Sequence, residues 1–307
     1  MSIHVHAIDP TYLLQENMRR SCLALHLTAA LLLSSPFHLA TAAPAAAAPA
    51  AAASAATPLV IGESFTIDSQ ALQEQRHINV YMARAWDTPP DAPLPVLYMP
   101  DGGVAEDFLH VAGLLQVSVA NGTMRPFMLV GMQNTQRRRD LTGPTESAED
   151  RKIAPVVGGA PAYRAFIRDE LMPEVKRRYR TTGETAIVGE SLAGLFVVET
   201  YLLEPQLFDH YLAFDPSLWW NHGALPRQAA DLLAKGKPGK HSLYLASSSE
   251  AGIAVEVQRL AQVLEKQAPP GLQWHQEKMP EETHGTIYHP AALKAFRAVF
   301  KPAAAPQ

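Results

Sequence analysis

The stretch GESLAG places a serine, Ser191, between a strand-like segment and a helix-like segment. It approaches the G-x-S-x-G pattern of serine hydrolases, with Ala193 in place of the last glycine and Gly194 one residue later. A serine hydroxyl is a nucleophile only when a base takes its proton and a tight turn presents it to a carbonyl carbon. Gly189 and Ala193 are the small residues that such a turn requires. The alternative interpretation of Ser191 is an ordinary helix cap.

A base for this serine is expected late in the chain. Strand–turn–helix hydrolases have the order serine, acid, histidine. Two histidines, His284 and His289, stand in THGTIYHP, between the last expected strand and the last expected helix. We expect His284 to be the base, because Gly285 gives its loop the freedom to bring the ring to Ser191. His289 directly precedes Pro290 and is expected to begin the helix.

Three carboxylates are candidates for the acid that orients the histidine and stabilises its charged form: Glu250, Glu256 and Asp215. We favour Glu250, the first carboxylate after the strand-like SLYLA. Each candidate also has a structural interpretation. Glu250 and Glu256 favour a helix N-terminus electrostatically, and Asp215 before Pro216 is typical of a turn. A Ser–His dyad without a dedicated acid is a further alternative.

Two backbone N–H groups are candidates for an oxyanion hole, the pair of donors that stabilises the charge developing on the attacked carbonyl. The first is Leu192, directly after the serine at the helix N-terminus. The second is Gly103, in the PDGG loop that follows the apolar run PVLYM. The alternative interpretation of Asp101-Gly102-Gly103 is a plain turn.

Short apolar runs that alternate with helical periodicities must position these residues. Strands are predicted at 64–70, 77–84, 95–99, 127–132, 185–188, 210–214, 242–246 and 272–278. Helices are predicted at 108–120, 162–179 with a kink or break at Pro173, 192–203, 253–266 and 290–300. Residues 134–160 show no clean period and are expected to form a long surface excursion. The order predicts an α/β fold with a mostly parallel sheet and an antiparallel edge.

The N-terminal region has the composition of an export signal. Met18-Arg19-Arg20 is a short basic start, and an apolar run and small residues follow it, so that residues 1–43 are interpreted as a signal peptide. We expect translation to begin at Met18. Residues 44–57 form an Ala/Pro-rich linker, and the folded domain is predicted over 58–302. This organisation predicts a periplasmic or secreted protein without stable membrane insertion after cleavage; an uncleaved anchor is the alternative.

Composition excludes several function classes. The 307 residues carry a net charge of −4 without a basic block, which argues against nucleic acid as a partner. The one cysteine, Cys22, lies in the predicted signal, so the mature protein would have no disulfide, thiolate metal site or cysteine nucleophile. The sequence contains no HExxH motif and no Cys/His cluster at metal-ligand spacing, so no metal site is predicted. No cofactor is expected.

The turn that presents Ser191 between strand and helix is called the elbow below. The longer stretch that contains it, VGESLAGLFVVETYLLEPQLFDHYLAFDPSLWW, resembles the putative-esterase branch of the α/β-hydrolase superfamily. PVLYMPDGG, NTQRRRDLT, FIRDELMPEVKRRYR and THGTIYHP extend the likeness over nearly all of residues 60–300. Within that branch the chain is most similar to secreted siderophore esterases, and more distantly to S-formylglutathione hydrolases and feruloyl esterases. The resemblance implies an α/β-hydrolase fold, with helices on both faces of the sheet.

The same resemblance implies site roles. Ser191 would be the nucleophile, His284 the base, and the backbone N–H groups of Gly103 and Leu192 the oxyanion hole. It also implies that Arg139 and the pair Trp219 and Trp220 lie near the substrate, where an arginine would hold an anionic or catecholate group and an indole would stack on an aromatic one. A surface ion pair with Asp140 and ordinary core packing are the alternatives for these three residues.

The sequence thus predicts a secreted serine esterase that hydrolyses carboxylic esters through an acyl-enzyme. Its partner would be a small-molecule ester, either a siderophore lactone or another aromatic acyl ester. An acyltransferase that uses the same acyl-enzyme is one alternative. A non-catalytic binding protein on a hydrolase scaffold is the other.

Overall fold

The computed structural model describes residues 55–236 and 239–302. The predicted signal peptide and most of the predicted linker lie outside the described residues. The described residues from Pro58 onward belong to one compact unit. Among the helices of the described ranges, none combines the length and apolar character that crossing a membrane requires.

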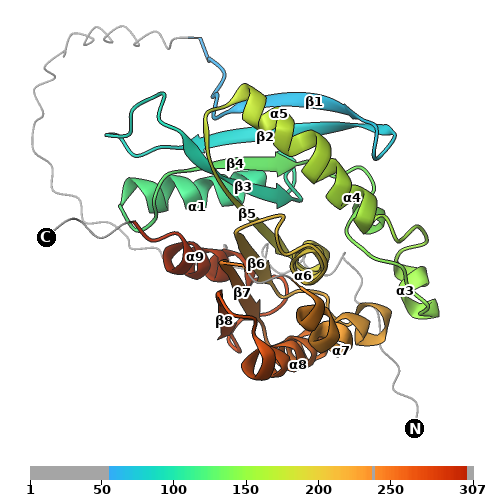
Figure 1. The fold of residues 1–307 in the computed structure, drawn as a ribbon. Helices are drawn as coiled ribbons and strands as arrows, with labels where there is room; N and C mark the ends of the chain where they lie inside the picture. The colour runs from blue at the N-terminus through green and yellow to red at the C-terminus, as the bar shows by residue number, and fades with distance from the viewer. Residues whose placement is uncertain (1–54, 237–238, 303–307) are drawn as a thin grey trace, which may run out of the picture. The chain divides into compact units, whose positions relative to one another are not determined.

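An eight-stranded sheet runs through this unit in the order β1-β2-β4-β3-β5-β6-β7-β8 (Figure 1). The strands are β1 (Glu63–Ser69), β2 (Glu74–Ala83), β3 (Leu94–Pro100), β4 (Phe127–Met132), β5 (Thr181–Glu190), β6 (His210–Phe214), β7 (His241–Ser247) and β8 (Leu272–Lys278). β2 is antiparallel to both of its neighbours, β1 and β4. Along the rest of the sheet, each neighbouring pair in the order β4-β3-β5-β6-β7-β8 is parallel. The predicted mostly parallel sheet with an antiparallel edge is therefore confirmed.

Helices cover both faces of the sheet (Figure 1). They are α1 (Phe108–Ala120), α2 (Arg137–Asp140), α3 (Ala148–Ile153), α4 (Ala160–Phe166), α5 (Met172–Arg178), α6 (Leu192–Leu203), α7 (Trp220–Lys235), α8 (Ala251–Gln267) and α9 (Tyr288–Val299). Adjacent residues of β4 point to opposite faces of the sheet and belong to different core layers. Leu129 packs in the layer under α1 and α9, and Val130 packs in the layer under α4 to α8. Every residue of β3 and β4 is buried, as the continuous apolar runs predict.

The predicted helix over 162–179 is neither broken nor ended at Pro173. A π-helical turn, Ile167–Leu171, joins α4 to α5, and Pro173 stands in the first turn of α5. A proline has no N–H to donate to the preceding turn, and a wider turn before it accommodates that loss.

One helix, α7, was not expected from the sequence. Its apolar spacing is interrupted by Pro226, and Asn221, His222 and Gly223 have positive φ near its start. The excursion at 134–160 likewise contains two short helices, α2 and α3, which are too short to produce a visible period. These irregular segments follow β4 and β6 and border the carboxyl ends of the parallel strands, where ligands of open α/β sheets bind.

The helix that follows the predicted nucleophile is enclosed by protein. All residues of α6 from Leu192 to Leu202 are buried, and the helix packs against β5, β6 and α7. This agrees with its sequence, which is apolar on most sides.

Candidate active site

Ser191 occupies a sharp turn between β5 and α6. Its backbone has φ 60° and ψ −121°, a conformation that non-glycine residues seldom adopt and that functional turns retain. The turn is tied to β6 and to the segment after it: Ser191 N–H donates to Phe214 O, and Ser217 N–H donates to Ser191 O, both at 3.0 Å. Ser191 is therefore not a conventional helix cap, and its side chain makes no capping bond.

The small residues around the serine are required by contact distances. A Cβ on Gly189 would lie 2.6 Å from the carbonyl carbon of Ala193, so any larger residue there would displace α6. A Cβ on Gly194 would lie 3.0 Å from Pro216 Cα. Gly194 therefore makes room for the segment after β6, while Ala193 fits against Gly189 with its methyl group in place.

His284 lies against Ser191, as the sequence predicts. The loop between β8 and α9 places Nε2 of His284 3.1 Å from Ser191 Oγ. On the other side of the ring, Nδ1 lies 2.8 Å from Asp215 Oδ2. With Nδ1–H donating to the carboxylate, Nε2 is free to accept the serine proton, which is the arrangement of a Ser-His-Asp triad. The second histidine, His289, instead stacks on His110.

The structure corrects the preference for Glu250 as the acid. Asp215 directly follows β6, the neighbour of β5, so that its carboxylate ends beside the elbow. It is fully buried and accepts bonds from Ser248 N–H and Oγ–H, both at 2.7 Å. Glu250 is exposed at the N-cap of α8, beyond β7, and makes no hydrogen bond to the ring. Glu256 bonds to Arg259 instead.

The hydrogen bond to Asp215 has an electrostatic consequence for the histidine. It is the principal cause that raises the pKa of His284 above its ordinary value, while partial burial of the ring opposes the rise. The charges of Glu190 and Asp215 add to the rise, and that of Glu250 contributes less. The site therefore stabilises the imidazolium that forms when the serine proton is transferred.

Of the two predicted oxyanion donors, Leu192 is the first residue of α6, where N–H groups have no acceptor within the helix. The other, Gly103, follows β3 as expected. Its N–H donates to Glu106 Oε2 at 2.7 Å. The loop is anchored by Asp101, which has positive φ and forms a two-pronged ion pair with Arg137.

The structure does not bring Arg139 to the triad. Its guanidinium pairs with Glu74 Oε1 at 2.8 Å and with Asp140 Oδ1 at 2.7 Å, so the ion-pair alternative describes it. The arginine of this segment that faces the site is Arg137, two residues earlier. Its charge acts on Glu190, and its side chain holds Asp101 beside the Gly103 loop. The one-turn helix α2 turns the two guanidinium groups in different directions.

The tryptophan pair also divides. Trp220 is 4% exposed and donates its indole N–H to Gly143 O at 3.1 Å, so it is a core residue without a free face for stacking. Trp219 is half-buried against the same core, with its ring centroid 6.1 Å from that of Trp220. Only Trp219 retains an accessible surface.

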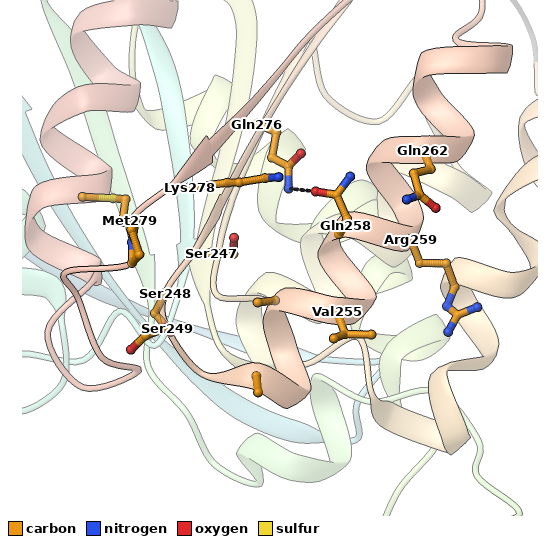
Figure 2. Close-up of a pocket in the computed structure, with 13 residues that line it drawn as sticks. Ser247, Ser248, Ser249, Val255, Gln258, Arg259, Gln262, Gln276, Lys278 and Met279 are labelled. Carbon is orange, nitrogen blue, oxygen red and sulfur yellow. Dashed lines mark hydrogen bonds between the residues drawn. The ribbon is translucent and has the colours of Figure 1, made fainter.

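A groove of about 740 Å³ lies between α8 and the ends of β7 and β8 (Figure 2). Ser248 lines it, and Gln258 and Gln276 are joined across it by a 3.4 Å hydrogen bond. Neither Ser191 nor His284 lines this groove. The groove therefore reaches Asp215 only through Ser248, the residue hydrogen-bonded to it, and it does not lead to Ser191.

Sequence reasoning missed several residues of the site. Glu106, Ser217 and Ser248 belong to loops, and Arg137 belongs to the one-turn helix α2. Their roles follow from tertiary contacts that no periodicity reveals. Glu190 stood in the motif itself: a carboxylate directly before the serine was the available signal.

Known proteins are similar to this chain in sequence and in fold. Residues 69–288 match the family model described as "Putative esterase". The chain is 30% identical over 168 residues to ferri-bacillibactin esterase BesA of Bacillus subtilis, which covers 48% of this chain and 56% of that protein. It is 35% identical over 147 residues to a siderophore triacetylfusarinine C esterase of Aspergillus fumigatus, covering 42% and 46%. These alignments span about half the length of the curated relatives.

Solved structures show the same fold. An IroE-like serine hydrolase from Shewanella oneidensis superposes with a TM-score of 0.70 at 28% identity, covering 78% of this chain and 80% of the other. The enterobactin esterase FES from Shigella flexneri, solved in the presence of enterobactin, gives a TM-score of 0.60 at 19% identity, covering 79% and 59%. The latter likeness concerns the fold alone. The two structures confirm the α/β-hydrolase fold, and the family match together with the curated relatives confirms the siderophore-esterase branch of the resemblance.

Proposed function

Because the chain belongs to the putative esterase family, we propose that it is a serine esterase that hydrolyses siderophore esters through an acyl-enzyme. The observation that carries the proposal is the line of hydrogen bonds from Ser191 Oγ through His284 to Asp215, at 3.1 and 2.8 Å. Two relatives are named for esters of siderophores, a bacillibactin and a fusarinine, which supports that substrate class here.

In the proposed reaction, Ser191 Oγ attacks the ester carbonyl carbon while His284 Nε2 takes the hydroxyl proton. The carbonyl oxygen becomes an oxyanion that accepts hydrogen bonds from the N–H groups of Leu192 and Gly103. The C–O bond to the alcohol breaks as His284 returns the proton to the leaving oxygen. A water molecule, deprotonated by the same nitrogen, then attacks the acyl carbon. The bond from that carbon to Ser191 Oγ breaks, His284 returns the proton to Oγ, and the acid is released.

Asp215 has a defined part in this cycle. It fixes the ring so that Nε2 faces the serine, and its negative charge stabilises the imidazolium. Ser248 in turn fixes Asp215 through the two bonds at 2.7 Å. These interactions preorganise the Asp215–His284 pair for the proposed reaction.

The proposal includes export to the periplasm or the medium. It rests on the basic, apolar and small-residue succession before residue 44 and on the absence of cysteine after Cys22. Sequencing the N-terminus of the precursor and of the protein recovered from the periplasm tests both Met18 as the start and the cleavage. A mature protein that retains residues 1–43 would contradict it.

The decisive experiment compares the wild-type protein with Ser191→Ala, using p-nitrophenyl acetate and then ferric and iron-free trilactone and hydroxamate-ester siderophores. We expect the variant to lose about 10⁴-fold or more in kcat. A fluorophosphonate should label Ser191 in the wild type alone. Ser217→Ala is a matched control, since that hydroxyl lies only 3.4 Å from Ser191 Oγ. Product analysis with an added alcohol separates hydrolysis from acyl transfer, and unchanged turnover in Ser191→Ala would refute the mechanism.

A further inference from the structure

A second carboxylate lies beside the histidine of the site. Glu190 Oε1 is 3.4 Å from His284 Nδ1, the same nitrogen that lies 2.8 Å from Asp215 Oδ2. We propose that Glu190 is a positioning residue that shares with Asp215 the orientation of the His284 ring and the stabilisation of its positive charge. This inference rests on the proposed hydrolase function and adds a residue to it.

The sheet explains why two carboxylates reach one nitrogen. Glu190 is the last residue of β5 and pairs with Phe214, the last residue of β6, while Asp215 follows one position later. The two carboxylates thus leave neighbouring parallel strands at the same edge. The Glu190 side chain is only 17% exposed, so its attraction to the ring is weakly screened by solvent.

The charges around Glu190 make it responsive to the ring. Burial raises the pKa of Glu190 to about 7, the charges of Asp215 and Asp101 add to the rise, and those of His284 and Arg137 oppose it. Near neutral pH a fraction of Glu190 is therefore protonated. A positive His284 imidazolium favours the ionised form of Glu190. The negative charge on Glu190 therefore increases at the step in which His284 takes up the serine proton.

With this arrangement Glu190 can partly replace Asp215 as the carboxylate partner of His284. Where one carboxylate serves the histidine, its conversion to an amide lowers kcat by about 10⁴-fold. Here Asp215→Ala removes the closer partner and leaves Nδ1–H able to donate to Glu190. We expect Asp215→Ala to lose about 10- to 100-fold in kcat/KM, and Glu190→Gln less than about 5-fold while Asp215 is present.

The test is a double-mutant cycle of Glu190→Gln and Asp215→Ala, with kcat/KM for p-nitrophenyl acetate as the measurement. The double variant should lose at least about 10-fold more than the product of the two single losses. Glu250→Gln is the matched control: it removes a carboxylate that acts on the ring at longer range, and its effect should be the same with and without Asp215. An equal effect of Glu190→Gln in both backgrounds would overturn the proposal.

A second measurement does not depend on turnover or on the fold of Asp215→Ala. NMR titration of the His284 ring should give a pKa about 0.5 to 1 unit lower in Glu190→Gln than in the wild type, because the nearby negative charge is gone. Glu250→Gln should move it less. An unchanged His284 pKa in Glu190→Gln sinks the inference even if the esterase is active. A wild type without ester turnover and without fluorophosphonate labelling sinks the proposed function instead.

Discussion

The carboxylate of Glu106 caps the backbone N–H of Gly103, with Oε2 2.7 Å from the nitrogen. It also accepts longer bonds from Asn134 N–H, at 3.3 and 3.4 Å. Gly103 is the proposed second oxyanion donor. Glu106 therefore places an internal negative group at a donor that the developing oxyanion would use, and in the proposed reaction a substrate must displace it.

The first prediction follows from that competition. Glu106→Ala should raise kcat/KM for a small ester by about 3- to 10-fold, because a charge-assisted hydrogen bond no longer has to be broken. Steady-state kinetics with p-nitrophenyl acetate measure it. Glu149→Ala, which removes an exposed carboxylate paired with Lys152, is the control and should change nothing. A lower kcat/KM in Glu106→Ala would mean that the carboxylate supports the loop and does not compete.

The second prediction concerns the elbow. Gly189→Ala should destabilise the protein and abolish esterase activity, because the new Cβ would lie 2.6 Å from the Ala193 carbonyl carbon, where backbone must move. Gly285→Ala, beside the histidine, is the control, since its Cβ would meet nothing within 4 Å. Thermal unfolding and ester turnover are the measurements. A fully active, equally stable Gly189→Ala variant would disprove the crowded turn.

The third prediction concerns pH. The neutral ring of His284 is the form that accepts the serine proton, and the bond to Asp215 raises its pKa above the ordinary 6.5. Activity should therefore fall as pH decreases through that raised pKa, with the midpoint of the kcat/KM profile above 6.5. Ser248→Ala removes one support of Asp215 and should lower the midpoint. A wild-type midpoint at or below 6.5 contradicts the proposed coupling.

The fourth prediction separates stability from substrate binding in the arginine network. Arg76 is fully buried and pairs with Asp140 at 2.7 Å and Glu74 at 2.9 Å. Arg76→Met should lower the free energy of unfolding by about 3 to 5 kcal/mol, because it removes the buried partner of a buried carboxylate. Arg139→Ala removes a half-buried partner of the same acids and should cost about 1 kcal/mol.

Urea unfolding compares these two variants, and KM for an anionic siderophore ester is the companion measurement. We expect KM to remain unchanged in Arg139→Ala, since its guanidinium is engaged by Glu74 and Asp140. A raised KM with unaltered stability would restore Arg139 as a substrate contact.

The sequence predicted those parts of the site that local pattern and chain order determine. Ser191 is recognisable from its small neighbours, and His284 from its place between the last strand and the last helix. The acid was not predictable in this way. The carboxylate beside the histidine depends on which strand end adjoins Ser191, and the order β5-β6-β7 places Asp215, not Glu250, against His284.

The arginines of helix α2 show the same limit. Arg137 and Arg139 are alike in sequence, and only the direction of one helical turn decides which approaches the site. The helix α7 was not predicted, because Asn221 and His222 near its start have positive φ. Amino-acid composition does not reveal that backbone conformation. The buried, continuously apolar strand β4 was predicted to the residue, and β3 to within one residue at each end, because burial on both faces leaves a plain pattern.

The burial of α6 from Leu192 to Leu202 has a consequence for how the proposed esterase would accommodate a bulky ester. A helix in which only the last residue, Leu203, is exposed opens to water only when much of the surrounding core opens with it. Backbone amide hydrogens along α6 should therefore exchange with deuterium as slowly as global unfolding permits. The oxygen proposed to attack the ester, Ser191 Oγ, would then directly precede the slowest-exchanging part of the molecule, and different esters would be accommodated by the surrounding loops.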